Sequence, residues 1–300
     1  MLTRLVRSLT RPDFRADPWR ALSRRLAWKL RWLRTREPWR LTLPNGSPIL
    51  VPAGGAGALI YYQGFSETDT ADFVLRFLAP GMTFLDIGAH FGEYTVLAAS
   101  RVGEGGRVHA FEPNPEIFDL LSENVRINAL ENVRLHPTAV SDREGQQEFR
   151  VFREPSLSSL MPPSAGGRAV GRGERSFPVR TVCLDGLIDD IGGRIDLVKV
   201  DVEGAEMLVF RGAGALLRLP ADQAPVWIFE HAAENYAAFG FRTSEVLSLL
   251  DAHGYEIHTY SALQGLGPVS SRALPSDVIN LVAVKKGRAR PFRWTHEQNS

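Results

Sequence analysis

Short apolar runs alternate with helical segments along most of the chain from residue 67 onward. An apolar run that ends in glycine or acidic residues is typical of a strand buried on both faces. The expected strands span residues 82–85, 107–111, 133–137, 197–201, 226–230, 255–260 and 278–285, with a long loop between the last two. The expected helices span residues 67–78, 93–102, 115–128, 184–190 and 243–253. This alternation predicts an α/β fold with a parallel, doubly wound sheet and helices on both of its faces.

The chain begins with a different pattern, which predicts an extension over residues 1–62 ahead of a main domain at 63–288 and a tail at 289–300. Four leucines, Leu22, Leu26, Leu30 and Leu33, follow a helical spacing with tryptophans between them. Residues 17–36 are therefore expected to form an amphipathic helix. A Pro-Asn-Gly-Ser turn between two β-like runs predicts a β-hairpin at 40–51, and the glycine-rich residues 53–57 are expected to form a loop.

Charge is distributed unevenly between this extension and the rest of the chain. Residues 1–40 contain twelve Lys or Arg and three acids, a local charge of +9, whereas the remainder carries −8 and the whole chain +1. A basic amphipathic helix can bind an anionic membrane surface, another anionic partner or nucleic acid, or it can pack its leucines on the domain and expose its arginines to solvent. Nucleic acid is the least favoured partner because nothing else in the chain is basic.

The segment between residues 150 and 179 interrupts the alternation, because it is rich in Ser, Pro and Gly. Such a composition predicts a mobile loop rather than a packed element. Loops of this length often act as lids over a binding site, although a tolerated insertion explains the composition equally well. We expect this loop to contribute to acceptor recognition.

Composition limits the other possibilities. With 300 residues and 44% apolar content, the chain is expected to form one large domain with an appendage. The single cysteine, Cys183, excludes an intrachain disulfide and is consistent with a reducing compartment. No run of about eighteen apolar residues predicts a spanning helix, and the arginine-rich start lacks the apolar core of a signal peptide, so we expect a cytoplasmic protein.

The segment from Thr83 to Thr95 is the strongest functional signal, because an apolar strand runs directly into Asp86, Gly88 and Gly92. A dinucleotide-binding turn reads G-x-G-x-x-G, whereas the spacing here is D-x-G-x-x-x-G. A carboxylate at this position would repel a pyrophosphate but can pair with the ammonium of S-adenosylmethionine. Glu112, at the end of the next strand, is placed to accept hydrogen bonds from ribose hydroxyls. These features disfavour an NAD-dependent oxidoreductase.

Together with segments that follow, this turn closely resembles the FkbM family of S-adenosylmethionine-dependent methyltransferases over roughly residues 64–230. The segments that carry the resemblance are Gly64-Phe-Ser-Glu67, Leu78-Ala-Pro-Gly81-Met82, the Asp86 turn, Phe111-Glu112-Pro113-Asn114-Pro115, Ala139-Val-Ser-Asp142-Arg-Glu-Gly145, Thr181-Val-Cys-Leu184-Asp185 and Ile195-Asp-Leu-Val-Lys199-Val-Asp201-Val-Glu203-Gly-Ala-Glu206. The resemblance implies a Rossmann-like class I methyltransferase sheet whose last strand is antiparallel.

The resemblance also implies S-adenosyl-L-methionine as cofactor and a hydroxyl as methyl acceptor. The residues expected to bind the cofactor are Asp86, Gly88, Ala89, His90, Gly92, Glu112, Pro113 and Asp142. His90 departs from the family pattern, in which this position is usually Asn. We expect cofactor binding to survive this change, because both side chains offer polar groups.

Catalytic groups are expected outside the carboxyl ends of the strands. Asp201, Glu230 and His231 are candidates for a general base, as are Glu203 and His90, and Lys199 is placed to lower the pKa of a nearby carboxylate or to hold an acceptor oxygen. Asp201 and Glu203 can alternatively cap a helix that begins near Glu203, and Glu206 is expected to be a helix-surface or structural acid. We expect no metal, because no HxH, HxxxH or CxxC spacing is present.

These patterns predict a cytoplasmic S-adenosylmethionine-dependent O-methyltransferase. The expected acceptor is a hydroxyl of a sugar, a glycan, a lipid-linked saccharide or a secondary metabolite, with peripheral contact between residues 1–40 and an anionic membrane at its inner face. The alternative is a non-catalytic module of the same fold that binds S-adenosylmethionine, and His90 is the feature that favours it.

Overall fold

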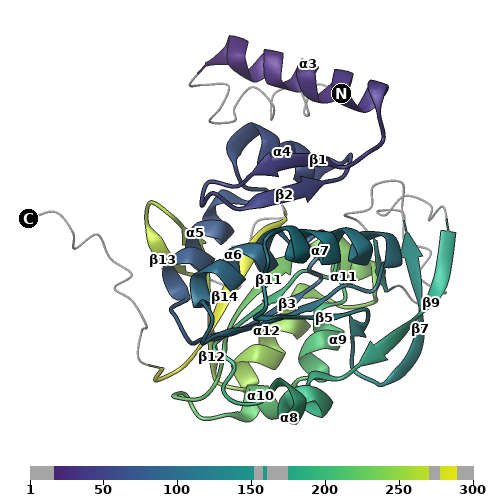
Figure 1. The fold of residues 1–300 in the computed structure, drawn as a ribbon. Helices are drawn as coiled ribbons and strands as arrows, with labels where there is room; N and C mark the ends of the chain where they lie inside the picture. The colour runs from purple at the N-terminus through teal and green to yellow at the C-terminus, as the bar shows by residue number, and fades with distance from the viewer. Residues whose placement is uncertain (1–16, 152–157, 161–174, 270–277, 289–300) are drawn as a thin grey trace, which may run out of the picture. The chain divides into compact units, whose positions relative to one another are not determined.

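The computed structural model of the chain describes residues 17–151, 158–160, 175–269 and 278–288 (Figure 1). It forms two compact units, residues 1–68 and 69–300, and each is described by itself. No helix among the described residues is long and apolar enough to cross a membrane.

The first unit contains the predicted amphipathic helix and hairpin. Helix α3, Pro18–Arg34, begins after Asp17, whose side chain accepts a hydrogen bond from the Arg20 amide at 3.0 Å. Strands β1, Trp39–Thr42, and β2, Pro48–Val51, pair in antiparallel fashion, which confirms the hairpin.

The loop predicted at residues 53–57 is wrong, because helix α4, Gly55–Gln63, begins inside it. Gly57 is part of this helix, and a Cβ there would lie 2.8 Å from the Pro52 carbonyl oxygen and 3.2 Å from the Trp28 ring. The glycine that suggested a loop therefore permits a close approach of the helix to its neighbours.

The second unit is built on an eight-stranded sheet in the order β13-β12-β14-β11-β10-β3-β4-β5 (Figure 1). Its strands are β3, Thr83–Ile87; β4, Arg107–Phe111; β5, Val133–His136; β10, Leu197–Val200; β11, Val226–His231; β12, Tyr255–Ser261; β13, Gly265–Pro268; and β14, Ile279–Lys285. The five strands from β11 to β5 are parallel, and β14 is antiparallel to both β11 and β12. The mostly parallel sheet with an antiparallel last strand is thus confirmed.

Strand β13 was not predicted, since its sequence was assigned to the long loop before the last strand. It pairs with β12 from Ser261↔Gly265 to His258↔Pro268. Glycine-rich edge strands lack the apolar alternation on which strand prediction depends. The rest of that loop, residues 270–277, lies outside the described residues.

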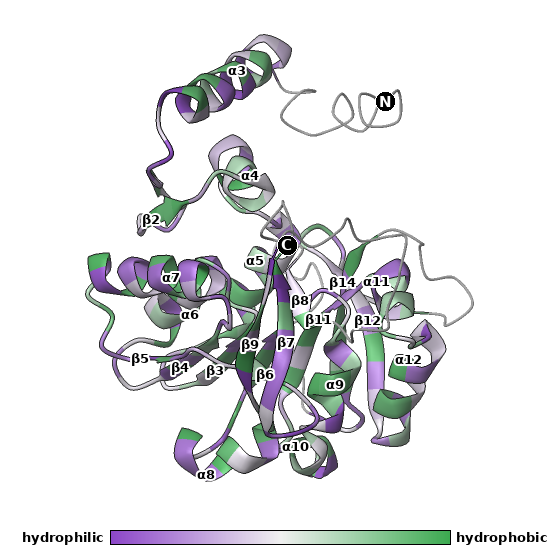
Figure 2. Cartoon of the chain, turned by 90° about the vertical axis from the view of Figure 1, so that its right-hand side faces the viewer, coloured by the Kyte–Doolittle hydropathy of each residue, from purple (hydrophilic) through white to green (hydrophobic). Residues whose placement is uncertain are grey.

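Helices cover both faces of the sheet (Figure 1). One face carries α5, Thr68–Phe77; α6, Glu93–Val102; and α7, Pro115–Ile127. The other carries α8, Ile188–Ile191, preceded by the 3₁₀ turn η2, Leu184–Leu187, together with α9, Glu206–Arg211; α10, Gly214–Arg218; and α12, Thr243–Ala252. Helix α11, Ala233–Ala238, follows β11. Helix α7 shows why these segments are helical, since hydrophobic and hydrophilic residues alternate along it and Ile117 and Leu121, four positions apart, are buried (Figure 2).

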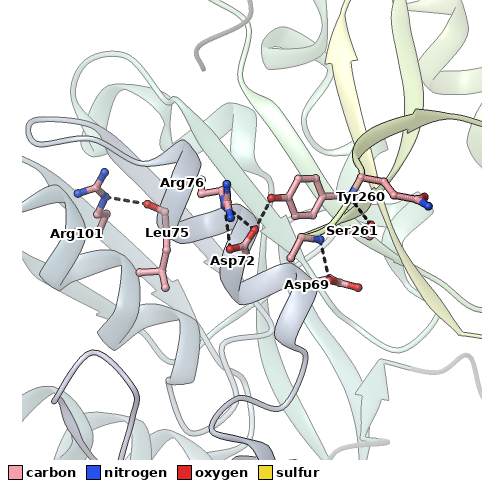
Figure 3. Close-up of polar contacts among 9 residues, drawn as sticks. Asp69, Asp72, Leu75, Arg76, Arg101, Tyr260 and Ser261 are labelled. Atoms are coloured by element: carbon pink, nitrogen blue, oxygen red, sulfur yellow. Dashed lines mark hydrogen bonds and ion pairs between the residues drawn. The ribbon is translucent and has the colours of Figure 1, made fainter. Parts of the chain in front are cut away.

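Helix α5 is joined to the end of β12 by side-chain hydrogen bonds (Figure 3). The Tyr260 hydroxyl donates to Asp72, which also pairs with Arg76 at 2.8 Å. The Ala262 amide donates to Asp69 at 2.9 Å. These contacts fix the helix that leads into β3, and therefore the start of the strand that carries Asp86.

A second, four-stranded sheet corrects the prediction that residues 150–179 form only a mobile loop. Its order is β6-β9-β7-β8, with β6, Ala139–Val140; β7, Gly145–Val151; β8, Ser159–Leu160; and β9, Arg175–Val182. Phe149, Val151, Leu160 and Val179 form a small core on this sheet. The Ser, Pro and Gly content hid this pairing, while the rest of the predicted loop, residues 152–157 and 161–174, lies outside the described residues.

Candidate active site

Asp86 lies at the end of β3 and is completely buried. Its Oδ2 accepts a hydrogen bond of 2.6 Å from the Thr95 hydroxyl on α6. Its Oδ1 is buried and has no hydrogen-bond partner among the described residues. Burial raises the pKa of this carboxyl, and the nearby Lys199 ammonium opposes that effect. An unsatisfied acceptor at this place fits a donor such as the ammonium group of S-adenosylmethionine.

The two glycines of the turn pack against protein rather than leaving space beside the backbone. Gly88 has a φ of +79°, and a Cβ on it would overlap the Asp201 carbonyl oxygen. Gly92 has a φ of +90°, and a Cβ there would lie 2.5 Å from Leu121 Cδ1. The amides of Gly88 and Ala89 both donate to the Phe111 carbonyl oxygen at 3.0 Å. The turn is therefore held tightly between β10, β4 and α7.

His90 adopts a left-handed backbone conformation, with a φ of +51°. Asn and His are among the non-glycine residues enriched in this region, which accounts for either residue at this position. Its ring packs on Phe91, and its Nε2 is buried with no hydrogen-bond partner in the described chain. Burial lowers the pKa of His90 to about 4, so the imidazole is neutral at pH 7.

Glu112, at the end of β4, connects two loops through backbone hydrogen bonds. Its Oε2 accepts from the His90 amide at 2.9 Å, and its Oε1 accepts from the Asn114 amide at 2.8 Å. Burial raises the pKa of Glu112 to about 7, although both hydrogen bonds oppose the shift. Each oxygen keeps a further lone pair, so binding of ribose hydroxyls by Glu112 stays a prediction, as does a contact to Pro113, the next residue.

Asp142 is another predicted cofactor residue. No hydrogen bond among the described residues joins it to the turn that follows Asp86. Its carboxylate lies near the Ser141 hydroxyl at 3.4 Å and Arg143 at 3.6 Å. Its backbone lies against Gly212, at the end of α9. A role for Asp142 at the adenine stays a prediction.

Three carboxylates gather where β10 and β11 end. Oxygen atoms of Asp201, Glu203 and Glu230 all lie within 4.8 Å of one another. Glu203 has a φ of +54° and accepts a hydrogen bond of 2.9 Å from the Asn235 amide group on α11. Burial, followed by repulsion from Asp201, raises the pKa of Glu203. Asn235 had no sequence signal, because only the fold brings α11 to this cluster.

A buried cation accompanies these acids. The Lys199 Nζ lies 2.8 Å from Asp201 Oδ2 and 4.6 Å from the centre of the Tyr94 ring. Lys199 sits in β10 directly beside Asp86 of β3 in the sheet register. The turn from Asp86 to Gly92, here called the cofactor turn after its predicted role, lies on one side of this ammonium group. The cluster of Asp201, Glu203 and Glu230, here called the acid cluster, lies on the other side, at the same edge of the sheet.

The capping role considered for Asp201 and Glu203 is wrong, because α9 begins only at Glu206 and no side chain caps it. Glu206 is completely buried and accepts a hydrogen bond of 3.1 Å from the Val202 amide. Burial raises the pKa of Glu206 to about 7. These contacts agree with the structural role expected for Glu206.

His231 is 2% exposed, its ring packs on Tyr236 and burial lowers its pKa. Successive residues of a strand point to opposite faces, so His231 and its neighbour Glu230 face different sides of β11. Since Glu230 faces the acid cluster, a catalytic role for His231 stays a prediction that this geometry does not favour.

The acid cluster also bears on metal binding. Carboxylate oxygens are the ligands that Mg²⁺ and Ca²⁺ prefer, and three of them converge here from two strand ends. The expectation of no metal depended on sequence spacing, which cannot detect residues that are 29 positions apart, as Asp201 and Glu230 are. That expectation stays a prediction.

Comparisons with known proteins show which family the chain belongs to. A family profile described as the Methyltransferase FkbM domain matches residues 86–257. Hexuronic acid methyltransferase AglP of Haloferax volcanii is 32% identical over 181 residues, which cover 55% of this chain and 68% of AglP. Methyltransferase sdnD of Sordaria araneosa is 30% identical over 153 residues, 43% of this chain and 59% of sdnD.

Solved structures show weaker similarity. A SAM-dependent O-methyltransferase from Thermotoga maritima is 15% identical, with 85% of this chain and 80% of that chain covered and a TM-score of 0.39. Precorrin-6y C5,15-methyltransferase from Geobacter metallireducens is 16% identical, with 72% and 87% covered and a TM-score of 0.40. Similarity at this level supports no argument about substrate or mechanism. The profile match over more than half of the chain establishes that this protein belongs to the FkbM family of S-adenosylmethionine-dependent methyltransferases.

Proposed function

We propose that the protein transfers a methyl group to a hydroxyl of a sugar, a glycan, a lipid-linked saccharide or a secondary metabolite. The observation that carries this proposal is the direct contact between the cofactor turn and the acid cluster. Gly88 packs on the Asp201 carbonyl group, and the Asp201 amide donates to the Ile87 carbonyl oxygen at 2.9 Å. A base at Asp201 would therefore lie beside the cofactor.

The cofactor, when bound, supplies a methyl carbon that is activated by a sulfonium leaving group. The protein must align the acceptor hydroxyl and remove its proton as the new oxygen–carbon bond forms. In this proposal the Asp201 carboxylate accepts that proton, and Lys199, 2.8 Å away, stabilises the ionised carboxylate. Burial raises the pKa of Glu203, and in its protonated form this carboxyl can donate a hydrogen bond to the acceptor. Glu230 would position the acceptor from the end of the neighbouring strand, β11.

A sugar acceptor is favoured by the similarity to AglP, a protein named as a hexuronic acid methyltransferase. We further propose a cytoplasmic location, in keeping with a single cysteine, and peripheral contact of residues 1–40 with an anionic membrane. Nucleic acid is not proposed as a partner, because the chain outside residues 1–40 is acidic overall.

The test begins with calorimetric titration of the purified chain with S-adenosylhomocysteine, with NADH as the control ligand. Labelled S-adenosylmethionine is then offered with hexuronic acids, glycans and lipid-linked sugars. We expect one-to-one binding of S-adenosylhomocysteine alone and transfer of label to a hydroxyl acceptor. Asp86→Asn should weaken cofactor binding by about 1–3 kcal/mol, and Asp201→Asn should leave binding intact while lowering kcat by about 10²–10⁴-fold.

Two outcomes would contradict the proposal. Binding of S-adenosylhomocysteine without label transfer to any acceptor would favour the non-catalytic module. Full activity in Asp201→Asn would show that Asp201 is not the base. The surface variant Glu104→Gln, at an exposed position after α6, is the control for both variants.

A further inference from the structure

Helix α3 exposes a stripe of large apolar side chains. Its members are Trp19, Leu22, Leu26, Leu30 and Leu33, and their exposed fractions are 81%, 53%, 57%, 42% and 82%. Their spacing of three or four residues places all five on one side of the helix. Within the described part of the first unit no apolar surface covers these leucines, and the alternative in which they pack on the main domain stays untested. Isolated exposed leucines are ordinary, but a continuous stripe of this kind marks a surface that binds something.

The opposite side of α3 is packed instead. Trp28 is 8% exposed and stacks on Trp39 and Tyr61, each at 5.7 Å between ring centres. The guanidinium groups of Arg24 and Arg25 lie 4.7 Å from the ring centres of Tyr61 and Tyr62, respectively. Arg24 also donates a hydrogen bond to the Tyr61 carbonyl oxygen. These contacts attach α3 to α4 and the hairpin by its tryptophan side, so the leucine stripe faces away from them.

Basic residues border the stripe. Helix α3 contains six Lys or Arg and no acid. The helical repeat places Lys29 along one side of the stripe and Arg34 along the other. Long basic side chains in these positions can extend to lipid headgroups while the leucines enter the acyl region, and each adds electrostatic attraction to an anionic surface.

We propose that the α3 stripe is a docking surface for an anionic lipid membrane, with the helix lying in the plane of the interface. The combination of a continuous apolar stripe and an entirely basic set of charges selects this partner. Pairing of two copies through their stripes would bring six positive charges of each helix together with no acid to neutralise them. The inference is independent of the proposed methyl transfer, since it involves none of the residues of the acid cluster.

The experiment is co-sedimentation of the full chain with two kinds of vesicle. One is phosphatidylcholine alone, and the other contains about a third phosphatidylglycerol, which makes its surface strongly anionic. We expect binding to the anionic vesicles only, falling as salt rises from about 0.05 to 0.5 M because the Debye length shortens. Leu26→Glu with Leu30→Glu should reduce binding at least about tenfold. The matched control is Leu263→Glu with Val278→Glu, which changes two exposed apolar residues of the second unit, at 78% and 59% exposure.

Equal binding by the stripe variant and the control variant would overturn the proposal, as would equal binding to neutral and anionic vesicles. A concentration-dependent dimer in analytical ultracentrifugation that only the stripe variant loses would assign the stripe to self-association instead. Circular dichroism of each variant shows whether it is folded. A second variant, Lys29→Glu with Arg34→Glu, retains the leucines and should lose the salt-sensitive part of the binding.

Discussion

The Lys199 ammonium lies 2.8 Å from the Asp201 carboxylate, and the two side chains are 2% and 27% exposed, respectively. A buried ammonium is costly unless an opposite charge accompanies it, and Asp201 supplies that charge. The partial exposure of Asp201 leaves its carboxylate accessible from solvent, where we propose that the acceptor binds. This pair therefore places an acid and a buried cation beside the turn that follows Asp86.

Lys199→Met should lower activity. Removing the ammonium leaves the Asp201 carboxylate without its ion-pair partner at 2.8 Å, and loss of a hydrogen bond to a charged group should lower kcat/KM by about tenfold or more. The control is Lys286→Met, which removes an exposed lysine from a surface ion pair with Asp251 at 3.0 Å. A Lys199→Met enzyme with the kcat/KM of the wild type would show that the ion pair does not contribute to the proposed reaction.

Gly88→Ala should distort the cofactor turn and destabilise the protein, whereas Gly81→Ala should be tolerated. Both glycines have a positive φ, +79° and +86°, so each substitution costs about 1–2 kcal/mol of backbone strain. Only at Gly88 would the new Cβ overlap the Asp201 carbonyl oxygen, while the space at Gly81 is open to 4 Å. Urea unfolding and S-adenosylhomocysteine titration of both variants measure the difference. Similar behaviour of the two variants would contradict the close approach of the turn to β10.

Glu206→Gln should make unfolding less dependent on pH. The pKa of Glu206 is raised from 4.5 to about 7 in the folded chain. The folded state therefore binds more protons than the unfolded state between these values, and the contribution of Glu206 to stability falls as the pH rises from about 4.5 to 7. The full loss corresponds to about 3 kcal/mol.

The measurement is the free energy of unfolding in urea at several pH values, compared between wild type and Glu206→Gln. The difference between the two proteins should change in favour of the variant as pH rises, because the glutamine stays neutral and retains an acceptor for the Val202 amide. The comparison cancels the opposite contribution of groups such as His90, whose pKa is lowered. A constant difference across this range would mean that Glu206 titrates normally.

Tyr260→Phe should destabilise the second unit by about 0.5–1.5 kcal/mol through loss of one hydrogen bond to Asp72. Arg76→Met removes the other partner of the same carboxylate, but Arg76 is 57% exposed, so its loss should cost at most about 1 kcal/mol. Thermal unfolding of both variants gives the comparison. If Arg76→Met cost more than Tyr260→Phe, the ion pair within α5 would contribute more to stability than the hydrogen bond that joins α5 to β12 (Figure 3).

Most of the fold could be predicted because its elements depend on short-range patterns. Helix α6 and strand β4 have the predicted boundaries, 93–102 and 107–111. Glycines flank the helix on both sides, and the strand is a short run of mostly apolar residues, so local sequence defines both. Helix α4 and strand β13 were missed because prediction used these local patterns, and the glycines in both segments are typical of loops. The small sheet around β7 and β9 depends on pairing across residues that the local composition assigned to a loop.

The sequence by itself determined the turn that follows Asp86 and the acids that follow β10 and β11, because each of these signals depends on a few neighbouring residues, and it determined the family because several such short segments recur along residues 64–230. Only the tertiary structure decided which acids meet: Glu230 joins Asp201 and Glu203, whereas His231 points away, because parallel pairing of β10 and β11 aligns their ends. The orientation of α3 was decided in the same way. Its leucine and tryptophan sides are both apolar, and the stacking of Trp28 on Trp39 and Tyr61 selects which side is buried. Contacts between distant segments depend on such packing, and a single segment does not encode it.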